Sequence, residues 1–311
     1  MLRAARIMSA NGSMSILRAA ARSPRVLLTR SAHGEAAMHR VRGGVAAPAP
    51  PQPASISVPG YVVTAPHART TSQSPDDYML SHPVYTKEEV ESLTASHFAP
   101  AGPGDRLAQL AINVVRGSFD ALTGYKPAPA HNSAAAYLTR IIFLETVAGV
   151  PGMVASMVRH FESLRLMRRD NGWIHTLLAE AENERMHLLT FLSLTKPSLP
   201  FRAAVLVTQG VFFNLFFLAY LIMPSTCHRF VGFLEEEAVT TYTHIIADLD
   251  AGKLPEWSAM PASALAKSYW RLPESAMMRD VLLAIRADEA IHRDVNHVFA
   301  SIKKTDKNPF A

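Results

Sequence analysis

Residues 286–297 read RADEAIHRDVNH and contain Glu289 and His292, which stand three positions apart. An α-helix has about 3.6 residues per turn, so these two side chains project from one face and can reach the same metal ion. The same spacing separates Glu184 from His187, in the string NERMHL at residues 183–188. The sequence therefore contains two half-sites for a metal, each on its own predicted helix.

Single carboxylates on two further predicted helices complete a pattern. Glu145 is the only charged residue in residues 141–158, and Glu235 lies in LEEEA at residues 234–238. A carboxylate in so apolar a stretch is costly to bury unless it is paired or bound to a metal, so a salt bridge from Glu145 to Arg140 or Arg159 stays open as the alternative. The order Glu, Glu-x-x-His, Glu, Glu-x-x-His is that of a ferritin-like di-iron four-helix bundle. We therefore expect an all-α fold and six metal ligands: Glu145, Glu184, His187, Glu235, Glu289 and His292.

Composition narrows the chemistry of such a site. The 311 residues are 49% hydrophobic, enough for a packed helical core. The single cysteine, Cys227, excludes an intramolecular disulfide and a thiolate cluster, so Glu, Asp and His must hold any metal. The formal charge of +5 arises from six arginines in the first 34 residues, and the rest of the chain indicates no nucleic-acid binding.

The N-terminal third divides into two predicted segments. Residues 1–34 interleave Arg, Ser and Ala without an acidic residue, which is typical of a mitochondrial transit peptide, with chloroplast import as the nearest alternative. Residues 35–104 form a Pro-rich N-terminal arm, with a linker at 43–74 and short helical pieces in 78–103. Residues 105–311 form the predicted bundle.

Capping signals place the long helices. Asp105 is the expected N-cap of the first, and Ser133 or Asn132 caps a second that ends near Asn171 and Gly172, with Pro151 kinking or interrupting it. The remaining helices are expected at residues 173–194, 201–224 and 226–250, and from about Glu274 onward.

Two of these segments suit a membrane. The helix that begins at Asp105 is strongly amphipathic, so it lies either on the bundle surface or on a bilayer. The apolar run at residues 203–223 has 21 residues, close to the ~20 of a transmembrane helix. Thr208, Gln209, Gly210 and Asn214 interrupt it, which favours a helix sunk in one leaflet or packed on the bundle over a span. We expect no second segment in the sequence with a comparable length and apolar character.

Six strings, in this order, resemble one known family. HPVYTKEEVES (82–92), FDALTGY (119–125), LET (144–146), NERMHL, LEEEA and RADEAIHRDVNH are similar to the alternative oxidases, the cyanide-insensitive ubiquinol oxidases of mitochondria. The resemblance covers roughly residues 82–301. Because several motifs occur in a fixed order, it is far more specific than any single motif.

The resemblance implies a function. Members are non-proton-pumping terminal oxidases that oxidise ubiquinol and reduce molecular oxygen to water at two iron ions. They are homodimers on one leaflet of the lipid bilayer, at the matrix face of the mitochondrial inner membrane, which counts against a true membrane crossing by the 201–224 helix. A plastid quinol oxidase of the same family is the alternative, and an iron-storage or structural metal bundle is one from another class.

The resemblance also implies roles for residues around the metals. Tyr242, two helical turns after Glu235, matches a tyrosine proposed to be redox-active, whereas a buried tyrosine that only hydrogen-bonds to a ligand is the alternative. Asn183 and Asp288 match residues that orient the ligands. The quinol pocket is expected at Arg116, Asp120, Arg140, Leu144, Glu237, Ala238 and Thr241.

Several residues fall outside this set. Ile291 is apolar where a polar residue is expected in many relatives, but it should point away from the metals. The regulatory N-terminal cysteine of plant members has no counterpart, so thiol control is not supported. The histidines without a partner at ligand spacing are expected to be structural, namely His160, His228 and His297.

Overall fold

The computed structural model describes residues 57–58, 61–62, 80, 82–126 and 132–311. The predicted transit peptide at residues 1–34 and most of the predicted arm up to residue 79 lie outside these ranges, so both remain predictions. Two strands of two residues, β1 (Ser57–Val58) and β2 (Tyr61–Val62), pair antiparallel. All other elements of the described residues are helices, which confirms the predicted all-α fold.

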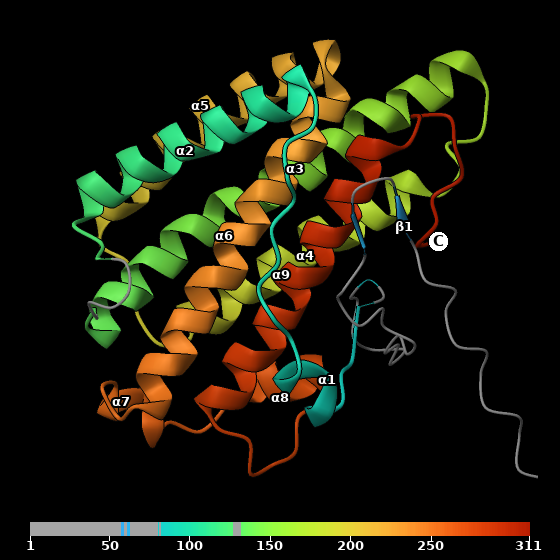
Figure 1. Ribbon diagram of the computed structural model, residues 1–311. Coiled ribbons are helices and arrows are strands. Elements are labelled where there is room, and N and C mark those ends of the chain that lie inside the picture. The colour runs from blue at the N-terminus through green and yellow to red at the C-terminus, as the bar shows by residue number, and fades with distance from the viewer. Residues whose placement is uncertain (1–56, 59–60, 63–79, 81, 127–131) are drawn as a thin grey trace, which may run out of the picture. The chain divides into compact units, whose positions relative to one another are not determined.

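Four long helices form the bundle within residues 52–311. They are α3 (Ala134–Leu166), α4 (Trp173–Leu192), α6 (Pro224–Asp250) and α9 (Met278–Ser301). The α3 helix packs along α4, and α6 packs along α9 (Figure 1). Fully buried side chains such as Phe191, Ile245 and Val281 fill the space between the two pairs.

Shorter and more peripheral helices surround this bundle. The α2 helix (Pro103–Thr123) packs on α6, and α5 (Leu199–Ile222) packs on α3, so that both lie along one side of the bundle (Figure 1). The short helices α1 (Lys87–Glu91), α7 (Pro255–Ser258) and α8 (Ala264–Trp270) lie at the opposite end. The one helix found in the predicted helical region at 78–103 is α1, which opens with a capping box at Thr86 and Glu89.

Several helix boundaries differ from those expected. The N-cap of α2 is Gly102 rather than Asp105, whose carboxylate instead accepts hydrogen bonds from the backbone N–H groups of Ala101 and Gly102 at 3.1 and 3.3 Å. The α3 helix ends at Leu166 rather than near Asn171, because Met167 adopts a left-handed conformation with φ 48°. The last long helix begins at Met278, four residues after the expected Glu274.

Pro151 does not interrupt α3, which continues unbroken around it. Proline lacks an N–H group, so the carbonyl of Val147, four residues earlier, loses its helical donor. The side chain of Gln209 on α5 donates to the adjacent carbonyl of Thr146 at 2.7 Å. A neighbouring helix is therefore hydrogen-bonded to α3 one residue from the point where the proline weakens it.

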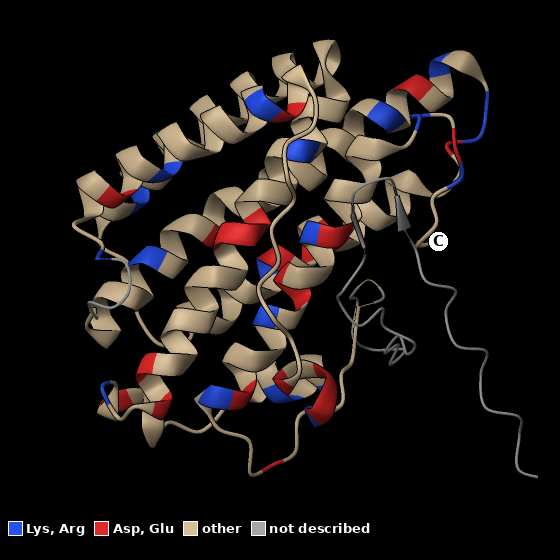
Figure 2. Ribbon diagram, viewed as in Figure 1, with Lys and Arg blue, Asp and Glu red and all other residues tan. Residues whose placement is uncertain are grey.

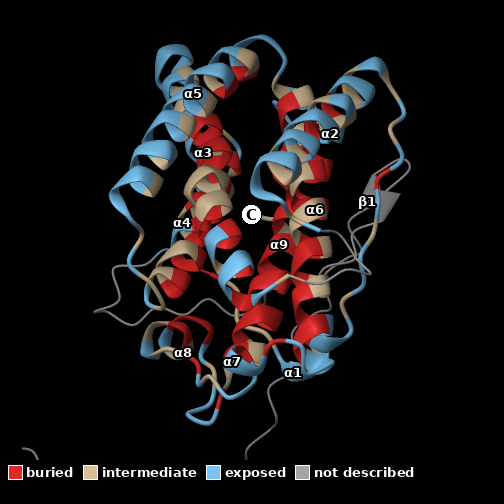
Figure 3. Cartoon of the chain, turned by 90° about the vertical axis from the view of Figure 1, so that its left-hand side faces the viewer, coloured by how far each residue is buried: buried red, intermediate tan, exposed pale blue. Residues whose placement is uncertain are grey.

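The side of the bundle that carries α2 and α5 is apolar and exposed. Leu206 and Ile222 on α5 are 72% and 76% exposed, and Leu110 and Val114 on α2 are each 59% exposed. Arg202 is the only charged residue of α5, which is otherwise tan in Figure 2 and largely pale blue in Figure 3. Single exposed apolar residues are ordinary, but a continuous apolar face of this size marks an interaction surface.

Two helices among the described residues, α3 and α5, are long and apolar enough to cross a membrane. The expectation that no second segment compares with the 203–223 run is therefore wrong. The two helices differ in burial. In the most apolar stretch of each helix, 50% of the residues are buried in α3 but only 11% are buried in α5. Length and composition are therefore alike in the two helices, and burial is what separates them.

The close packing of α3 on α4 can be tested at Gly152. A Cβ atom there would lie 2.7 Å from the carbonyl oxygen of Leu177 and 3.2 Å from the backbone nitrogen of Ala181, both on α4. We expect Gly152→Ala to lower the free energy of unfolding by about 1–3 kcal/mol, measured by denaturant titration, because the helices must move apart. Gly117 on α2 has nothing within 4 Å, so Gly117→Ala should be neutral or slightly stabilising. Equal stability of the two variants would contradict this account.

Candidate metal centre

All six predicted metal ligands meet in the centre of the bundle. Their donor atoms form two groups, and within each group the atoms lie within 4.8 Å of one another. The first group contains Glu145 and His187, the second contains Glu235 and His292, and Glu184 and Glu289 belong to both. Two overlapping groups of this kind would suit two adjacent metal ions, with Glu184 and Glu289 in both groups and one further glutamate and one histidine in each.

One helix supplies each ligand motif. Glu145 lies on α3, Glu235 lies on α6, and the two Glu-x-x-His pairs lie on α4 and α9. Their helical spacing turns both members of a pair toward the bundle axis, as the sequence indicates. All six are buried, and the His187 ring is completely inaccessible to solvent.

Both histidines aim one ring nitrogen into the cluster. The Nδ1 atom of His187 lies 3.4–3.5 Å from oxygens of Glu145, Glu184 and Glu289. The Nδ1 atom of His292 lies 2.7 Å from Glu184 Oε1 and 3.5 Å from Glu289 Oε2. Carboxylate oxygens and imidazole nitrogens thus face one another across a small interior space.

The cluster contains buried polar atoms that lack a properly aligned hydrogen-bond partner. They are Oε2 of Glu145, both oxygens of Glu184, Oε2 of Glu289, and the Nδ1 atoms of His187 and His292. Buried polar atoms are normally satisfied, and unsatisfied ones are costly. Metal ions bind where several lone pairs point into the same small space. The donor atoms of these six residues therefore suit a pair of cations. Oxygen and nitrogen donors without thiolate suit iron and related ions.

Without cations, the cluster must retain protons. Burial raises the pKa of the Glu145 carboxyl to about 8, and burial followed by the charges of Glu289 and Glu184 raises the pKa of Glu235 well above its usual range. Burial alone would lower the pKa of His187, but hydrogen bonds that its ring donates to Asp288 and the cluster glutamates raise that pKa well above its usual range. Bound cations would favour ionised carboxylates and neutral imidazoles, and would displace these protons.

Asp288 organises the side of the cluster behind His187. Its completely buried carboxylate accepts hydrogen bonds from His187 Nε2 at 3.0 Å, Asn183 Nδ2 at 3.1 Å and Trp270 Nε1 at 2.8 Å, and a fourth from the hydroxyl of Tyr85. Because Nε2 donates to Asp288, the Nδ1 atom of neutral His187 keeps its lone pair for a metal. Asn183 and Asp288 therefore stand where the sequence predicts orienting residues.

Tyr85, Tyr269 and Trp270 also belong to this network, and no sequence pattern singles them out. Tyr269 on α8 accepts a hydrogen bond from Asn183 through its hydroxyl at 2.9 Å, and its backbone carbonyl lies 2.5 Å from His82 Nε2. Tyr85 lies in the string HPVYTKEEVES, which is one of the six that resemble the family, and this was the only sign of a role for it. The spacing of residues along the chain gives no indication that Tyr85 contacts Asp288, about 200 residues later. The segment before α2 thus packs on the centre and contributes to it.

Tyr242 lies beside the cluster. Its buried hydroxyl donates to Glu145 Oε1 at 2.6 Å, so a tyrosine that hydrogen-bonds to a ligand is what the geometry contains. The alternative of a salt bridge from Glu145 to an arginine is wrong, because Arg140 pairs with Asp120 at 2.6 Å and Arg159 pairs with Asp170 at 2.8 Å.

A cavity of about 210 Å³ extends from the cluster toward the exposed face of α2 and α5. Its walls are mostly apolar, and Glu145, Glu235, Glu289 and Tyr242 lie at its inner end. Six of the seven predicted quinol-binding residues line it, namely Arg116, Arg140, Leu144, Glu237, Ala238 and Thr241. The seventh, Asp120, lies behind the wall and pairs with Arg116 and Arg140.

The histidines expected to be structural have different surroundings. His160 is exposed, whereas His228 and His297 are buried and hydrogen-bonded outside the metal cluster. His228 bonds to Asn296 Oδ1 and to the Tyr220 hydroxyl, both at 2.9 Å, and burial lowers its pKa to about 4. His297 bonds to Glu236 Oε1 at 2.9 Å.

Glu180 is a further buried carboxylate that the sequence analysis did not assign. Both of its oxygens accept from Asn296 Nδ2, at 2.9 and 3.1 Å, and burial raises its pKa to about 7. Its position one turn before Glu184 was the only signal in the sequence.

Comparison with known proteins gives a consistent result. The sequence model of the family described as "Alternative oxidase" matches residues 85–301. A mitochondrial alternative oxidase of Cryptococcus neoformans var. grubii is 50% identical over 255 residues, which are 75% of this chain and 64% of that relative. Those of Emericella nidulans and Yarrowia lipolytica are 52% and 51% identical, over 74% of this chain and 68% of each relative. The match to the Cryptococcus protein thus covers less than two thirds of that protein.

The role of Asp288 can be tested without an activity assay. We expect Asp288→Asn to weaken metal binding by about 10–100-fold, because an amide cannot accept the hydrogen bonds of all four donors and leaves the His187 ring without its carboxylate partner. Metal titration of the chelator-treated chain measures this. Asp250→Asn, at an exposed carboxylate paired with Arg279, is the matched control and should bind as wild type does. Equal affinities for the two variants would refute the positioning role.

Proposed function

Because the chain belongs to the alternative oxidase family, we propose that it is a terminal oxidase that oxidises ubiquinol and reduces oxygen to water without pumping protons. The proposed centre holds two iron ions and is insensitive to cyanide. The observation that carries the proposal is the pair of overlapping Glu/His groups at the inner end of an apolar cavity. Ligands, cavity and family agree on one reaction class.

Two iron ions at this centre would supply the reversible electron storage that the reduction of oxygen requires. The ligands would be Glu145 and His187 for one position, Glu235 and His292 for the other, and Glu184 and Glu289 between them. The protein supplies four carboxylates that balance the charge of two dications, and a carboxylate, Asp288, that fixes the coordinating nitrogen of His187. The surrounding core excludes bulk water from the site.

The cavity suits a quinol with an apolar tail. Its mostly apolar walls would hold the tail, while Arg116, Arg140 and Glu237 offer hydrogen bonds to the head group. Arg140 is buried, pairs with Asp120, and stacks over the rings of Phe119 and Tyr125 at 4.7 and 4.1 Å, so its position is fixed. A substrate whose polar head lies near Arg140 would be close to Glu145 and Tyr242.

Tyr242 is positioned for a role in the transfer of electrons or protons. Its hydroxyl proton is held by Glu145, so oxidation of the ring would have a carboxylate nearby to receive that proton. Burial and the charge of Glu145 raise the pKa of Tyr242 well above its usual range, so the phenol stays protonated at rest. We propose that it is a redox-active neighbour of the metals.

The location follows from the same proposal. The exposed apolar face of α2 and α5 suits one leaflet of a bilayer, into which the tail of a quinol would extend from the cavity. The relatives are named mitochondrial alternative oxidases, which favours the matrix face of the mitochondrial inner membrane over a plastid. The apolar face also disfavours iron storage in a water-soluble shell. Assembly as a homodimer stays a prediction.

Oxygen uptake tests the reaction. Membranes that contain the wild-type chain should consume oxygen with ubiquinol as donor in the presence of cyanide, and Glu184→Ala should abolish uptake, because it removes a bridging carboxylate. Glu182→Ala, at a partly exposed residue two positions earlier on α4 that pairs with Arg185, is the matched control and should retain activity. Absence of uptake by the wild type, or its survival in Glu184→Ala, would refute the proposed function.

Arg140 provides a separate test of the quinol site. Arg140→Lys keeps the charge but loses the planar guanidinium that pairs with Asp120 and stacks on two rings. We expect the KM for ubiquinol to rise by about tenfold or more, an effect of the size of one hydrogen bond to a charged group, while the iron content stays unchanged. A variant with the wild-type KM would place the quinol head elsewhere.

A further inference from the structure

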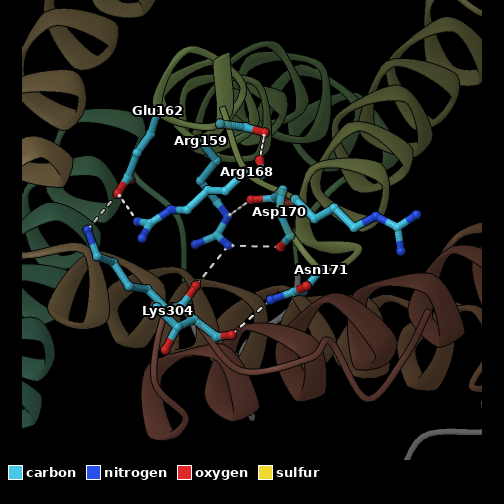
Figure 4. A pocket seen from close by; sticks show the side chains of 9 residues that line it. Arg159, Glu162, Arg168, Asp170, Asn171 and Lys304 are labelled. Carbon is cyan, nitrogen blue, oxygen red and sulfur yellow. Dashed lines mark hydrogen bonds and ion pairs between the residues drawn. The ribbon is translucent and has the colours of Figure 1, made fainter. Parts of the chain in front are cut away.

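A second cavity, of about 230 Å³, lies outside the metal centre at the far end of α3. Three segments meet there: the last turns of α3, the turn that leads into α4, and the tail that follows α9 (Figure 4). Its lining is almost entirely polar or charged, and comprises Arg159, Glu162, Ser163, Arg168, Arg169, Asp170, Asn171, Lys304 and Thr305.

A buried arginine holds the three segments together. Arg159 is 7% exposed, and its guanidinium lies 4.1 Å over the ring of Trp173. It donates to Asp170 Oδ1 at 2.8 Å and to the carbonyl oxygen of Lys304 at 3.0 Å. Asn171 adds a hydrogen bond to the carbonyl of Thr305 at 2.9 Å. The floor of the cavity is thus a fixed structure rather than a chance meeting of surface side chains.

The rim of the cavity has more positive than negative charge. Arg168 NH2 and Lys304 Nζ both contact the same oxygen of Glu162, Oε1, at 3.2 and 2.9 Å. Arg159 is neutralised by Asp170, and among the described residues Arg169 has no ion-pair partner within 4.0 Å. Four cationic side chains therefore meet two carboxylates in the lining, which leaves an excess of two positive charges.

We propose that this cavity binds an anion with a phosphate group, held by Arg168 and Lys304 at its rim. Phosphate offers several acceptor oxygens and, as a monoester near neutral pH, between one and two negative charges, close to the local excess. Guanidinium and ammonium groups are the usual phosphate ligands in proteins. The phosphate would bind the Arg168 and Lys304 side chains in place of Glu162, which both of them contact in this structure. The Glu162 carboxylate therefore competes with the phosphate for these two cationic groups.

Two sources can supply the same phosphate chemistry. Apolar residues in the last turns of α3 and directly after it are exposed, among them Phe161 at 52%, Leu164 at 59% and Met167 at 92%. A phospholipid could therefore place its head group in the cavity and its acyl chains beside these residues. A soluble phosphate monoester would need only the charged lining. The inference does not depend on the chemistry at the metal centre, so either can fail without the other.

The first arm of the test uses inorganic phosphate as the probe. Isothermal titration of the full chain, at an ionic strength kept constant with chloride, should detect phosphate binding. Arg168→Gln together with Lys304→Gln should weaken it by about tenfold or more, because two charge-assisted contacts are lost. Glu162→Gln should strengthen it by about threefold or more, because the competing carboxylate loses its charge. Arg279→Gln, at the opposite end of α9 and paired with Asp250, is the matched control and should bind as wild type does.

The second arm uses vesicles of phosphatidylcholine alone or with added phosphatidylglycerol. If a head group occupies the cavity, added phosphatidylglycerol should strengthen sedimentation of the wild type with the vesicles, and the double variant should lose that gain while still binding phosphatidylcholine. Variant-sensitive binding in either arm supports the proposal and identifies the source. It is overturned if neither arm separates the double variant from Arg279→Gln, or if Glu162→Gln weakens binding.

Discussion

The rest of the structure depends on burying four glutamates and two histidines within a helical core. Isolated charges in such a place are strongly destabilising, and the raised pKa values of Glu145 and Glu235 reflect that cost. The two proposed cations would resolve the conflict, because they would favour ionised carboxylates and neutral imidazoles. The two groups share Glu184 and Glu289, so each group needs residues from both helix pairs. Metal binding would therefore be coupled to the packing of α3–α4 against α6–α9.

Asp288 extends that constraint beyond the four helices. It connects α9 to α4 through His187 and Asn183, to α8 through Trp270, and to the segment before α1 through Tyr85. These donors come from distant parts of the chain and meet at one carboxylate with no exposed surface. The peripheral segments thus help to hold the His187 ring in place through their contacts with Asp288.

The polar interior is matched by an apolar exterior on one side only. The cavity that reaches Glu145 and Glu235 passes between residues of α2, α3, α5 and α6, toward the face where leucines and valines are exposed. The proposed quinol substrate, which is insoluble in water, would enter from that face without crossing water. Charged residues gather elsewhere, as at the end of α3, where Arg159 forms an ion pair with Asp170 in the turn before α4 and donates a hydrogen bond to the carbonyl of Lys304 in the C-terminal tail.

The sequence by itself determined the helical fold, the family and the six residues that meet in the Glu/His cluster, because Glu-x-x-His spacing places two side chains on one helical face and because the motifs occur in a fixed order. Only the tertiary structure decided that Glu184 and Glu289 belong to both groups of the cluster, that Glu145 faces His187 and Tyr242 rather than an arginine, and that Tyr85, Tyr269 and Trp270 complete the network around Asp288. It also separated α3 from α5, whose apolar sequences are alike. The physical reason is that periodicity is a property of one helix, whereas bridging, pairing and burial depend on distances between helices that no local pattern encodes.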